Sequence, residues 1–362
     1  MTYKAAPEFD ALVGRVPEEI WQRLRGTRWF VTGGTGWFGR NLLETVVRAN
    51  TLIGTGIAVT ILSRNPARFA AEVPHLASAP GIELQSGDIT DFPFPAGDFS
   101  HVLHAAATSA RETSTGEPPL AKFDMLVDGT RRVLEFVRRC GATHLLFTSS
   151  GVATAPPVGG IYREDEIAAP SSLDPATALG QGKRAAEFLC ASHGAAYGIN
   201  TTIARCFSFV GPFMPLDLHY AIGNFIREAL NGEPIIVKGD GSPLRSYLYT
   251  GDLVIWLLTL LARKGSPRIY NVGSDRGISI GDLAERVCDA LAPGLNVRIL
   301  GKTTLSVGNP TRDHYVPDIT RAREELQLDV WTPLEQAIRD TASHALRSTG
   351  LPILHGATKH DL

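Results

Sequence analysis

The sequence predicts an α/β fold with a doubly wound parallel sheet and a smaller, mostly helical C-terminal domain. Two observations predict it. Short apolar, β-prone runs alternate with helical patterns through the first half of the chain, and a glycine-rich turn joins the first strand to the first long helix. After about residue 206 this alternation loosens into helices and short strands. The alternation favours a parallel sheet, and its later loss favours a second, smaller unit.

The glycine turn has the spacing Gly33-x-x-Gly36-x-x-Gly39, with an apolar run at 29–31 before it and helical apolar spacing over 42–47. Strand, glycine turn and helix are the context of a dinucleotide-binding fingerprint. Gly33 permits the tight turn, Gly36 lets the backbone approach a pyrophosphate, and Gly39 lets the helix pack close to the strand. The helix N-terminus offers N–H groups and the positive end of its dipole to phosphate. We therefore predict a Rossmann domain that binds NAD or NADP; the alternative is a chance glycine cluster in a turn.

The end of the second strand, 58–62, bears on the choice of cofactor. An acidic residue there would bind the adenosine ribose 2′-hydroxyl and favour NAD, whereas an arginine accommodates a 2′-phosphate. The chain has Ser63 and Arg64 and no carboxylate at this point. NADP is therefore slightly favoured over NAD. The alternative is that Arg64 is a solvated loop residue.

Three more strands complete the predicted sheet. The run 82–89 is a strand followed by a polar pair, in which Asp88 is placed to meet an adenine edge or to form a turn. The run 101–107 enters a loop of small residues that lets the backbone approach a cofactor. A helix around 127–139 precedes the strand 144–150, which ends in hydroxyl side chains. Ligands are expected at the carboxyl ends of these strands.

Composition excludes several classes of function. The 362 residues carry a formal net charge of −2, so no basic field indicates nucleic-acid binding. The first ten residues lack the apolar core of a signal peptide. The longest apolar run, 253–262, is too short to cross a bilayer and predicts a buried helix, with Asp252 as its N-cap. The four cysteines show no metal-ligand spacing. We therefore expect a cytoplasmic protein without a membrane span or a metal.

These motifs resemble the extended short-chain dehydrogenase/reductases of the NAD-dependent epimerase/dehydratase family, which act mostly on nucleotide sugars. The likeness runs from about residue 27 to about residue 345. Its motifs are 32–39, 104–106, 204–212, 239–245 and 249–252. Together with the strand ends, they assign cofactor binding to Gly33, Gly36, Trp37, Phe38, Gly39, Ser63, Arg64, Asp88, Ile89, His104, Ala105, Ala106 and Lys183.

The resemblance also implies a catalytic set, and the chain departs from it at one position. Family members assist hydride transfer with a Ser or Thr hydroxyl and a Tyr-x-x-x-Lys pair on one helix. Ser150 matches the hydroxyl and Lys183 matches the lysine, but Leu179 stands where the tyrosine belongs. Leucine can neither donate nor accept a proton. Three explanations are open. The chain is a variant of an active enzyme that has lost its acid/base catalyst, or another group, such as Ser150, Tyr162 or water, has taken over that role. In the third explanation the protein has lost catalysis and retained cofactor or ligand binding.

The substrate residues implied by the resemblance are also altered in part. Gly151 and Val152 replace the acidic pair with which dehydratases of the family expel a hydroxyl, which argues against dehydration. Arg245 and Arg312 match positions that bind a diphosphate, for which guanidinium groups are suited because they donate two parallel hydrogen bonds. Ser208 stands at the family's asparagine and weakens one expected contact.

The resemblance therefore predicts an NAD(P)-dependent nucleotide-sugar epimerase-type oxidoreductase that works through a keto intermediate, impaired by Leu179. The alternatives are an NADPH-dependent carbonyl reductase with a non-sugar substrate and a non-catalytic cofactor-binding protein. Members of the family commonly form homodimers, so the resemblance also predicts a homodimer. The chain is predicted to begin with an N-terminal helical extension, 1–26, followed by a Rossmann domain, 27–205. A substrate-binding domain, 206–348, follows, with some segments free to return to the Rossmann domain. A mobile tail, 349–362, ends the chain.

Overall fold

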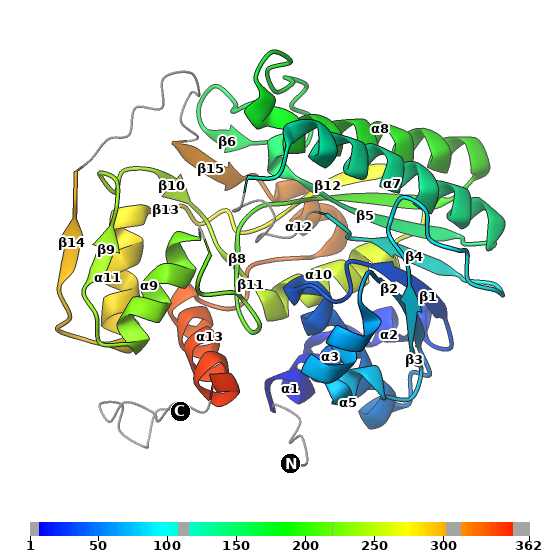
Figure 1. Cartoon of the computed structure of the whole chain (residues 1–362), viewed down its shortest axis with the longest axis horizontal. Coiled ribbons are helices and arrows are strands. Elements are labelled where there is room, and N and C mark those ends of the chain that lie inside the picture. Colours follow the sequence, from blue (N-terminus) through cyan, green and yellow to red (C-terminus); the bar gives the residue numbers. More distant parts are fainter. Residues whose placement is uncertain (1–6, 108–115, 219, 302–312, 350–362) are drawn as a thin grey trace.

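A seven-stranded parallel sheet forms the centre of the molecule (Figure 1). The computed structural model of the chain describes residues 7–107, 116–218, 220–301 and 313–349. The strands follow the order β12-β7-β5-β4-β1-β2-β3, so the predicted doubly wound fold is confirmed. Their bounds are β1 Arg28–Thr32, β2 Ala58–Ser63, β3 Ile82–Ser86, β4 His101–His104, β5 His144–Ser150, β7 Asn200–Cys206 and β12 Arg268–Val272.

Both faces of this sheet are buried, each against its own set of helices. Along β1, Trp29 and Val31 belong to one hydrophobic core and Phe30 to the other, because side chains alternate between the faces of a strand. The helices that pack around the sheet are α1 Pro7–Arg15, α2 Glu18–Leu24, α3 Trp37–Ile53, α4 Pro66–Glu72, α5 Pro74–Ala77, α7 Pro119–Arg139, α8 Ala178–Tyr197 and α10 Thr250–Leu261. Helix α7 begins well before the predicted 127–139, with Pro119 at its first position, where a missing N–H costs nothing.

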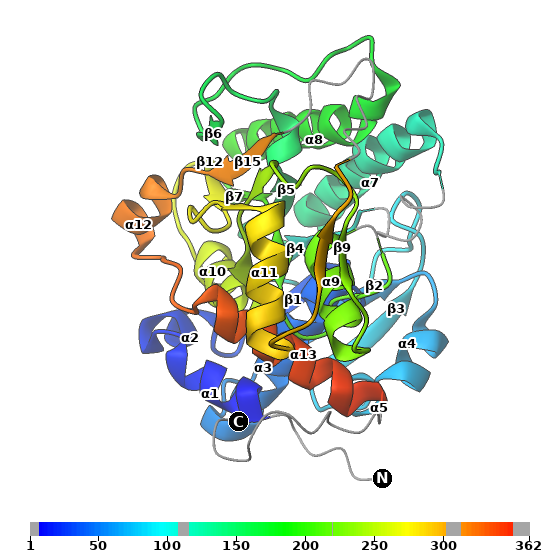
Figure 2. The same cartoon turned by 90° about the vertical axis from the view of Figure 1, so that its left-hand side faces the viewer.

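A second unit lies beside the sheet and faces the viewer in Figure 2. Its helices share a separate hydrophobic core. Its elements are α9 Ala221–Leu230, β9 Ile235–Val237, α11 Ile280–Leu291, β14 Val297–Ile299 and α13 Leu334–Thr349. Although they follow residue 206, α10 and β12 pack with the large sheet. The predicted tail beyond residue 349 lies outside the described residues.

Short strands connect the two units. A small sheet has the order β13-β10-β15-β6, and β8 pairs with β11. These strands are β6 Ile161–Tyr162, β8 Phe209–Val210, β10 Leu244–Arg245, β11 Leu248–Tyr249, β13 Ile278–Ser279 and β15 His314–Pro317. Two 3₁₀ turns, η1 Gly151–Ala153 and η2 Pro175–Thr177, precede α8 in the chain. Of the helices in the described ranges, none has both the length and the apolar composition of a bilayer span.

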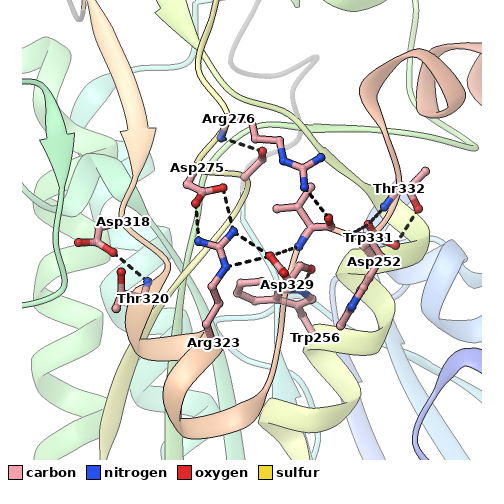
Figure 3. A network of polar contacts seen from close by, with 12 residues as sticks. Asp252, Trp256, Asp275, Arg276, Asp318, Thr320, Arg323, Asp329, Trp331 and Thr332 are labelled. Atoms are coloured by element: carbon pink, nitrogen blue, oxygen red, sulfur yellow. Dashed lines mark hydrogen bonds and ion pairs between the residues drawn. The ribbon is translucent and has the colours of Figure 1, made fainter.

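The apolar run 253–262 lies in α10 and is buried, as predicted, but the prediction that Asp252 caps this helix is wrong. The N-cap is Tyr249, and Asp252 lies inside the first turn with no exposed surface. Its carboxylate accepts a hydrogen bond from Arg15 at 2.6 Å. It also accepts from the backbone N–H groups of Trp331 and Thr332 at 3.1 and 2.8 Å (Figure 3). It therefore joins α1 and the segment before α13 to the sheet.

The same segment is held by a polar network around α12, Thr320–Leu326 (Figure 3). Arg323 forms ion pairs with Asp275, after β12, and with Asp329 at 2.7 Å. The indole of Trp256 on α10 donates to the carbonyl of Asp329 at 3.0 Å. The chain from β15 to α13 is thereby fixed to the large sheet.

We predict that Asp252→Ala lowers the free energy of unfolding by about 3 kcal/mol, because it removes a buried carboxylate that satisfies two N–H groups and a guanidinium. Urea denaturation followed by far-ultraviolet circular dichroism measures the change. Glu285→Ala on the exposed face of α11 is the control and is expected to change stability by less than about 0.5 kcal/mol. Equal effects of the two substitutions would contradict the anchoring role of Asp252.

Candidate active site

The glycine turn between β1 and α3 is a tight backbone cradle. Gly33 has φ +75°, and a Cβ there would lie 2.6 Å from the carbonyl carbon and oxygen of Ala105. A Cβ on Gly39 would overlap the backbone of Gly34. Gly36 is exposed at the N-cap of α3, whose first turn leaves N–H groups without helical partners. Gly33 and Gly39 therefore permit close packing. Gly36 is exposed at the positive end of the helix, and a Cβ on it would already lie 3.3 Å from the carbonyl oxygen of Gly33.

This cradle lies where the strand order of the sheet reverses. The chain runs from β1 to β2 and β3 on one side and returns to β4 on the other side of β1. Ligands of doubly wound sheets bind at such a switch point, outside the carboxyl ends of the strands. The N–H of Ala105 donates to the carbonyl of Thr32 at 3.1 Å, and the N–H of Ala106 donates to the hydroxyl of Thr32 at 3.1 Å. These bonds fix the small-residue loop beside the glycine turn. The backbone here fits the pyrophosphate of a dinucleotide.

Two side chains predicted to bind cofactor are core residues. His104 is 3% exposed and lies between the hydroxyls of Thr32 and Thr130, at 2.9 and 3.0 Å. Burial lowers the pKa of His104 to about 3, so the ring is neutral at physiological pH. Ile89 is buried against Gly129 on α7. Any part of these positions in cofactor binding belongs to their backbone.

The residues at the ends of β2 and β3 are arranged as local turns. The hydroxyl of Ser63 is buried and accepts from the N–H of Asn65 at 3.2 Å. Asp88 accepts from the N–H and hydroxyl of Thr90 at 3.0 and 2.8 Å, which is an Asx turn. Arg64 is exposed directly after β2. Arg64 therefore occupies the position after the strand at which the adenosine ribose is recognised in this fold.

Trp37 and Phe38 open helix α3 and are half-buried. Their rings lie 4.6 Å apart, and Phe38 meets Phe209 edge to face at 4.8 Å. They attach the N-terminal turn of α3 to β8.

A buried ion pair sets the position of α8 against the sheet. Glu187 on α8 and Arg205 on β7 are each 5% exposed and pair at 2.8 Å. The hydroxyl of Ser149 on β5 donates to Glu187 at 2.5 Å. Leu179 and Lys183 precede Glu187 at intervals of four, so the three residues share one face of the helix. The predicted positions of the tyrosine and lysine are therefore brought to the end of β5, next to Ser150.

Lys183 is buried beneath this edge. Its ammonium donates to the carbonyl of Thr148 at 2.7 Å and lies 4.8 Å from the centre of the Phe147 ring. Burial lowers the pKa of Lys183 to about 8. The side chain is therefore still mostly protonated at pH 7.

Leu179 packs against a cluster of buried side chains, which we call the aromatic cluster: Val152, Tyr162, Phe207 and Tyr315. The hydroxyl of Tyr315, on β15, lies 3.4 Å from Ser150 Oγ. Tyr315 is a neighbour of Ser150 that sequence patterns did not indicate. No local pattern could have indicated it, because it is 165 residues away from Ser150 in the chain.

The predicted substrate residues are only partly described. Ser208 is half-buried, and its carbonyl accepts from the N–H of Leu248 at 3.0 Å, where β11 pairs with β8. Arg245 is half-buried on β10 and donates to the carbonyl of Leu244 at 2.7 Å. Arg312 lies outside the described residues. Within the described ranges, no three His, Cys, Asp or Glu side chains are placed to hold a metal ion.

Two cavities lie near these strands. One of about 360 Å³ is lined by Pro156 and Pro157, Gly159 and Gly160, and Asp313 and His314, which come directly before Tyr315. The second has about 630 Å³ and borders β10 and α11. Its charged lining residues are Arg276, Arg286, Asp282, Glu285, Asp289 and Glu335. Because carboxylates outnumber guanidinium groups there, the second cavity is poorly suited to a diphosphate.

Comparison with known proteins identifies the relatives of this chain. The model of the NAD dependent epimerase/dehydratase family matches residues 29–273. UDP-glucuronic acid decarboxylase 1 of Arabidopsis thaliana is 28% identical over 320 residues, which cover 88% of this chain and 69% of that protein.

Two solved structures have the same fold. One is a UDP-glucuronic acid 4-epimerase from Bacillus cereus in complex with UDP-glucuronic acid and NAD, with 20% identity, a TM-score of 0.73, and coverage of 88% of this chain and 99% of that chain. The other is a UDP-N-acetylglucosamine 4-epimerase from Methanobrevibacter ruminantium, with 21% identity, a TM-score of 0.72, and coverage of 89% and 99%.

We predict that Gly36→Val weakens NADH binding about tenfold or more, because the added side chain fills the space through which a pyrophosphate reaches the helix N-terminus. Fluorescence titration with NADH measures the effect. Its control is Gly14→Val on α1, where a Cβ meets nothing within 4 Å. Unchanged NADH affinity in a folded Gly36→Val protein would contradict the assignment of the cradle.

We also predict a pH-dependent stability term from Lys183. Its pKa of about 8 in the folded protein lies below its ordinary value of 10.5, so the unfolded chain binds this proton more tightly. The contribution of Lys183 to the unfolding free energy therefore rises as pH increases from about 8 to about 10.5, by up to about 3 kcal/mol. Urea denaturation of the wild type and of Lys183→Met across this range should show the rise in the difference between them. Parallel curves would argue against a charged, buried Lys183.

Proposed function

The chain belongs to the NAD-dependent epimerase/dehydratase family, a family of enzymes, and from that membership we propose that it is a nucleotide-sugar oxidoreductase of the epimerase type. One observation carries the proposal. The glycine cradle, Ser150 and Lys183 all lie at the carboxyl ends of the strands, at the switch point of one sheet. A site that accommodates a dinucleotide therefore lies beside a hydroxyl and an ammonium that can act on a bound alcohol or ketone.

The cradle residues hold the cofactor in this proposal. The backbone at Gly33 and Gly36 and the first turn of α3 take the pyrophosphate, and Lys183 holds the nicotinamide ribose. When bound, the nicotinamide supplies the acceptor and donor of a hydride. Ser150 donates a hydrogen bond to the reacting sugar oxygen and stabilises the negative charge that develops on it in the transition state of hydride transfer. With the cofactor bound, return of the hydride to the opposite face of the keto sugar would give the epimer.

Leu179 makes this enzyme slower than a relative with a complete catalytic set. General acid–base help is worth about 10²–10⁴-fold, and Leu179 supplies none. Its side chain packs against the aromatic cluster instead. We therefore propose that turnover persists at a reduced rate.

The substrate proposed is a nucleotide sugar whose diphosphate binds Arg245 and Arg312. UDP-glucuronic acid is the first to test, because relatives in sequence and in structure are named for it. Oxidation of the alcohol β to its carboxylate gives a β-keto acid, so a single oxidised intermediate can lead to epimer or to decarboxylated product. Product analysis separates these outcomes.

The choice of cofactor, the oligomeric state and the location stay predictions. NADP is slightly favoured over NAD because Arg64 is exposed at the end of β2. The solved relative named above has NAD bound. A homodimer and a cytoplasmic location follow from the family resemblance and the composition.

A carbonyl reductase is the second candidate, favoured by the same arginine, since NADPH commonly serves as a reductant. Net consumption of NADPH distinguishes the two functions. An epimerase returns its hydride to the substrate and leaves the cofactor pool unchanged, whereas a reductase oxidises one NADPH for each product.

We predict that Leu179→Tyr raises the rate of product formation about tenfold, because it adds an acid/base on the helix face that carries Lys183. Wild type and variant are incubated with a panel of nucleotide sugars and with NAD or NADP, and products and cofactor absorbance are followed by mass spectrometry and spectrophotometry. Leu173→Tyr, at an exposed position, is the control for an added phenol. If neither protein forms product while NADH still binds, the enzyme proposal fails and a non-catalytic binding protein is favoured.

A further inference from the structure

A phenol hydroxyl from another strand lies at the end of β5, where the family tyrosine at position 179 is missing. At position 179 the helix presents a leucine that packs on the aromatic cluster. From the opposite side, β15 places the hydroxyl of Tyr315 3.4 Å from Ser150 Oγ. Catalytic hydrogen bonds are often long without substrate and shorten when it binds. A substrate oxygen bound to Ser150 would therefore lie within reach of this phenol.

We propose that Tyr315 is the acid/base catalyst of this enzyme, acting with Ser150 on the reacting oxygen of the substrate in place of a tyrosine at position 179. The proposal rests on the proposed function and adds the identity of its proton-transfer group.

The backbone is built to admit the phenol. A Cβ on Gly151 would lie 2.9 Å from the Tyr315 hydroxyl and 2.6 Å from the ring of Phe207. Since real Cβ atoms almost never approach so closely, any larger residue at 151 would displace the Phe207 ring, the Tyr315 hydroxyl or both. The phenol ring is held by Phe207 at 4.7 Å and by Tyr162 at 5.3 Å, and Tyr315 is 9% exposed. The hydroxyl is therefore both close to Ser150 and fixed in position.

The Tyr315 hydroxyl also contacts the neighbouring strand of the large sheet. It donates to the carbonyl of Cys206 at 3.4 Å. Cys206 ends β7 and is paired in register with Ser150, which ends β5. The phenol hydroxyl is therefore held at the carboxyl ends of both strands.

Other candidates for the proton transfer fit less well. An aliphatic hydroxyl such as Ser150 ionises far less readily than a phenol, whose ordinary pKa is about 10. Tyr162 is 2% exposed, deeper than Tyr315, and its ring lies edge-on to Phe207 and Tyr315 inside the cluster. Tyr315 is therefore the phenol that the structure places against Ser150.

The step balances as follows. In the oxidising direction the alcohol O–H bond breaks and its proton passes to the phenolate of Tyr315. The C–H bond of the same carbon breaks with its electron pair, which leaves as hydride to the oxidised nicotinamide, and a C=O bond forms. In the reducing direction the neutral phenol gives the proton back to the oxygen as the carbon regains hydride.

The kinetic test uses Tyr315→Phe, which keeps the ring and removes the hydroxyl. We expect turnover of the wild-type chain to fall about 10²-fold or more with little change in KM. In the Leu179→Tyr background the same substitution is expected to cost less than about threefold, because the phenol at 179 then carries the proton. Tyr162→Phe tests the neighbouring phenol, and Tyr197→Phe, which is exposed on α8, is the control.

A second measurement needs no cofactor or substrate. If the hydroxyls of Ser150 and Tyr315 are in contact, the effects of Ser150→Ala and Tyr315→Phe on urea denaturation are non-additive in the unliganded protein. Additive effects would overturn the contact and the proposal with it.

The outcomes separate this inference from the proposed function. If the wild type turns over and Tyr315→Phe keeps its rate, or if Tyr162→Phe is the variant that loses activity, the assignment of Tyr315 alone is overturned. If neither wild type nor Leu179→Tyr acts on any nucleotide sugar, the proposed function fails and the assignment fails with it. A rate lost in Tyr315→Phe and regained with Leu179→Tyr supports both.

Discussion

The buried ion pair between Glu187 and Arg205 is the constraint on which the catalytic edge depends. Both groups are removed from water, so neither can lose its partner without leaving an uncompensated charge, which costs several kcal/mol. Because the pair ties α8 to β7 and, through Ser149, to β5, it prevents the helix from sliding or rotating. Lys183 and position 179 lie one and two turns before Glu187. The same ion pair therefore fixes where these two side chains lie relative to Ser150.

The features that sequence reasoning could predict are those encoded by neighbours in the chain. The glycine spacing before α3 and the Ser150 and Lys183 motifs are local patterns, and the strand–helix alternation gave the sheet correctly. Asp252 was misjudged because its partners, Arg15 and the segment at 331–332, are distant in sequence. A carboxylate near a helix start looks like a cap until those partners are known.

His104 and Tyr315 also have surroundings that local sequence patterns could not predict, because their contacts are distant in sequence. His104 belongs to a cofactor motif, but the hydroxyls of Thr32 and Thr130 meet its ring and turn it into a core group that joins β1, β4 and α7. Tyr315 belongs to no recognised motif, and the small sheet carries its hydroxyl to Ser150. In the proposed mechanism the acid/base thus moves from the helix of the large domain to a strand of the small sheet. The chemistry then depends on how well the two units are held together, which is the task of Asp252 and Arg323.

The two ends of the described chain are also in contact. Glu8 on α1 pairs with Arg347 on α13 at 2.7 Å, and Phe213 lies between Phe9 and His344. The Asp252 carboxylate adds a second link between the N-terminal helices and the segment before α13. Contacts of such long sequence separation form late, because the loop-closure entropy must be overcome first. While the ribosome has made only the Rossmann strands, the emerging chain therefore leaves uncovered the parts of α1 and α10 that the C-terminal residues later contact. An incomplete chain of this kind is prone to aggregation and proteolysis.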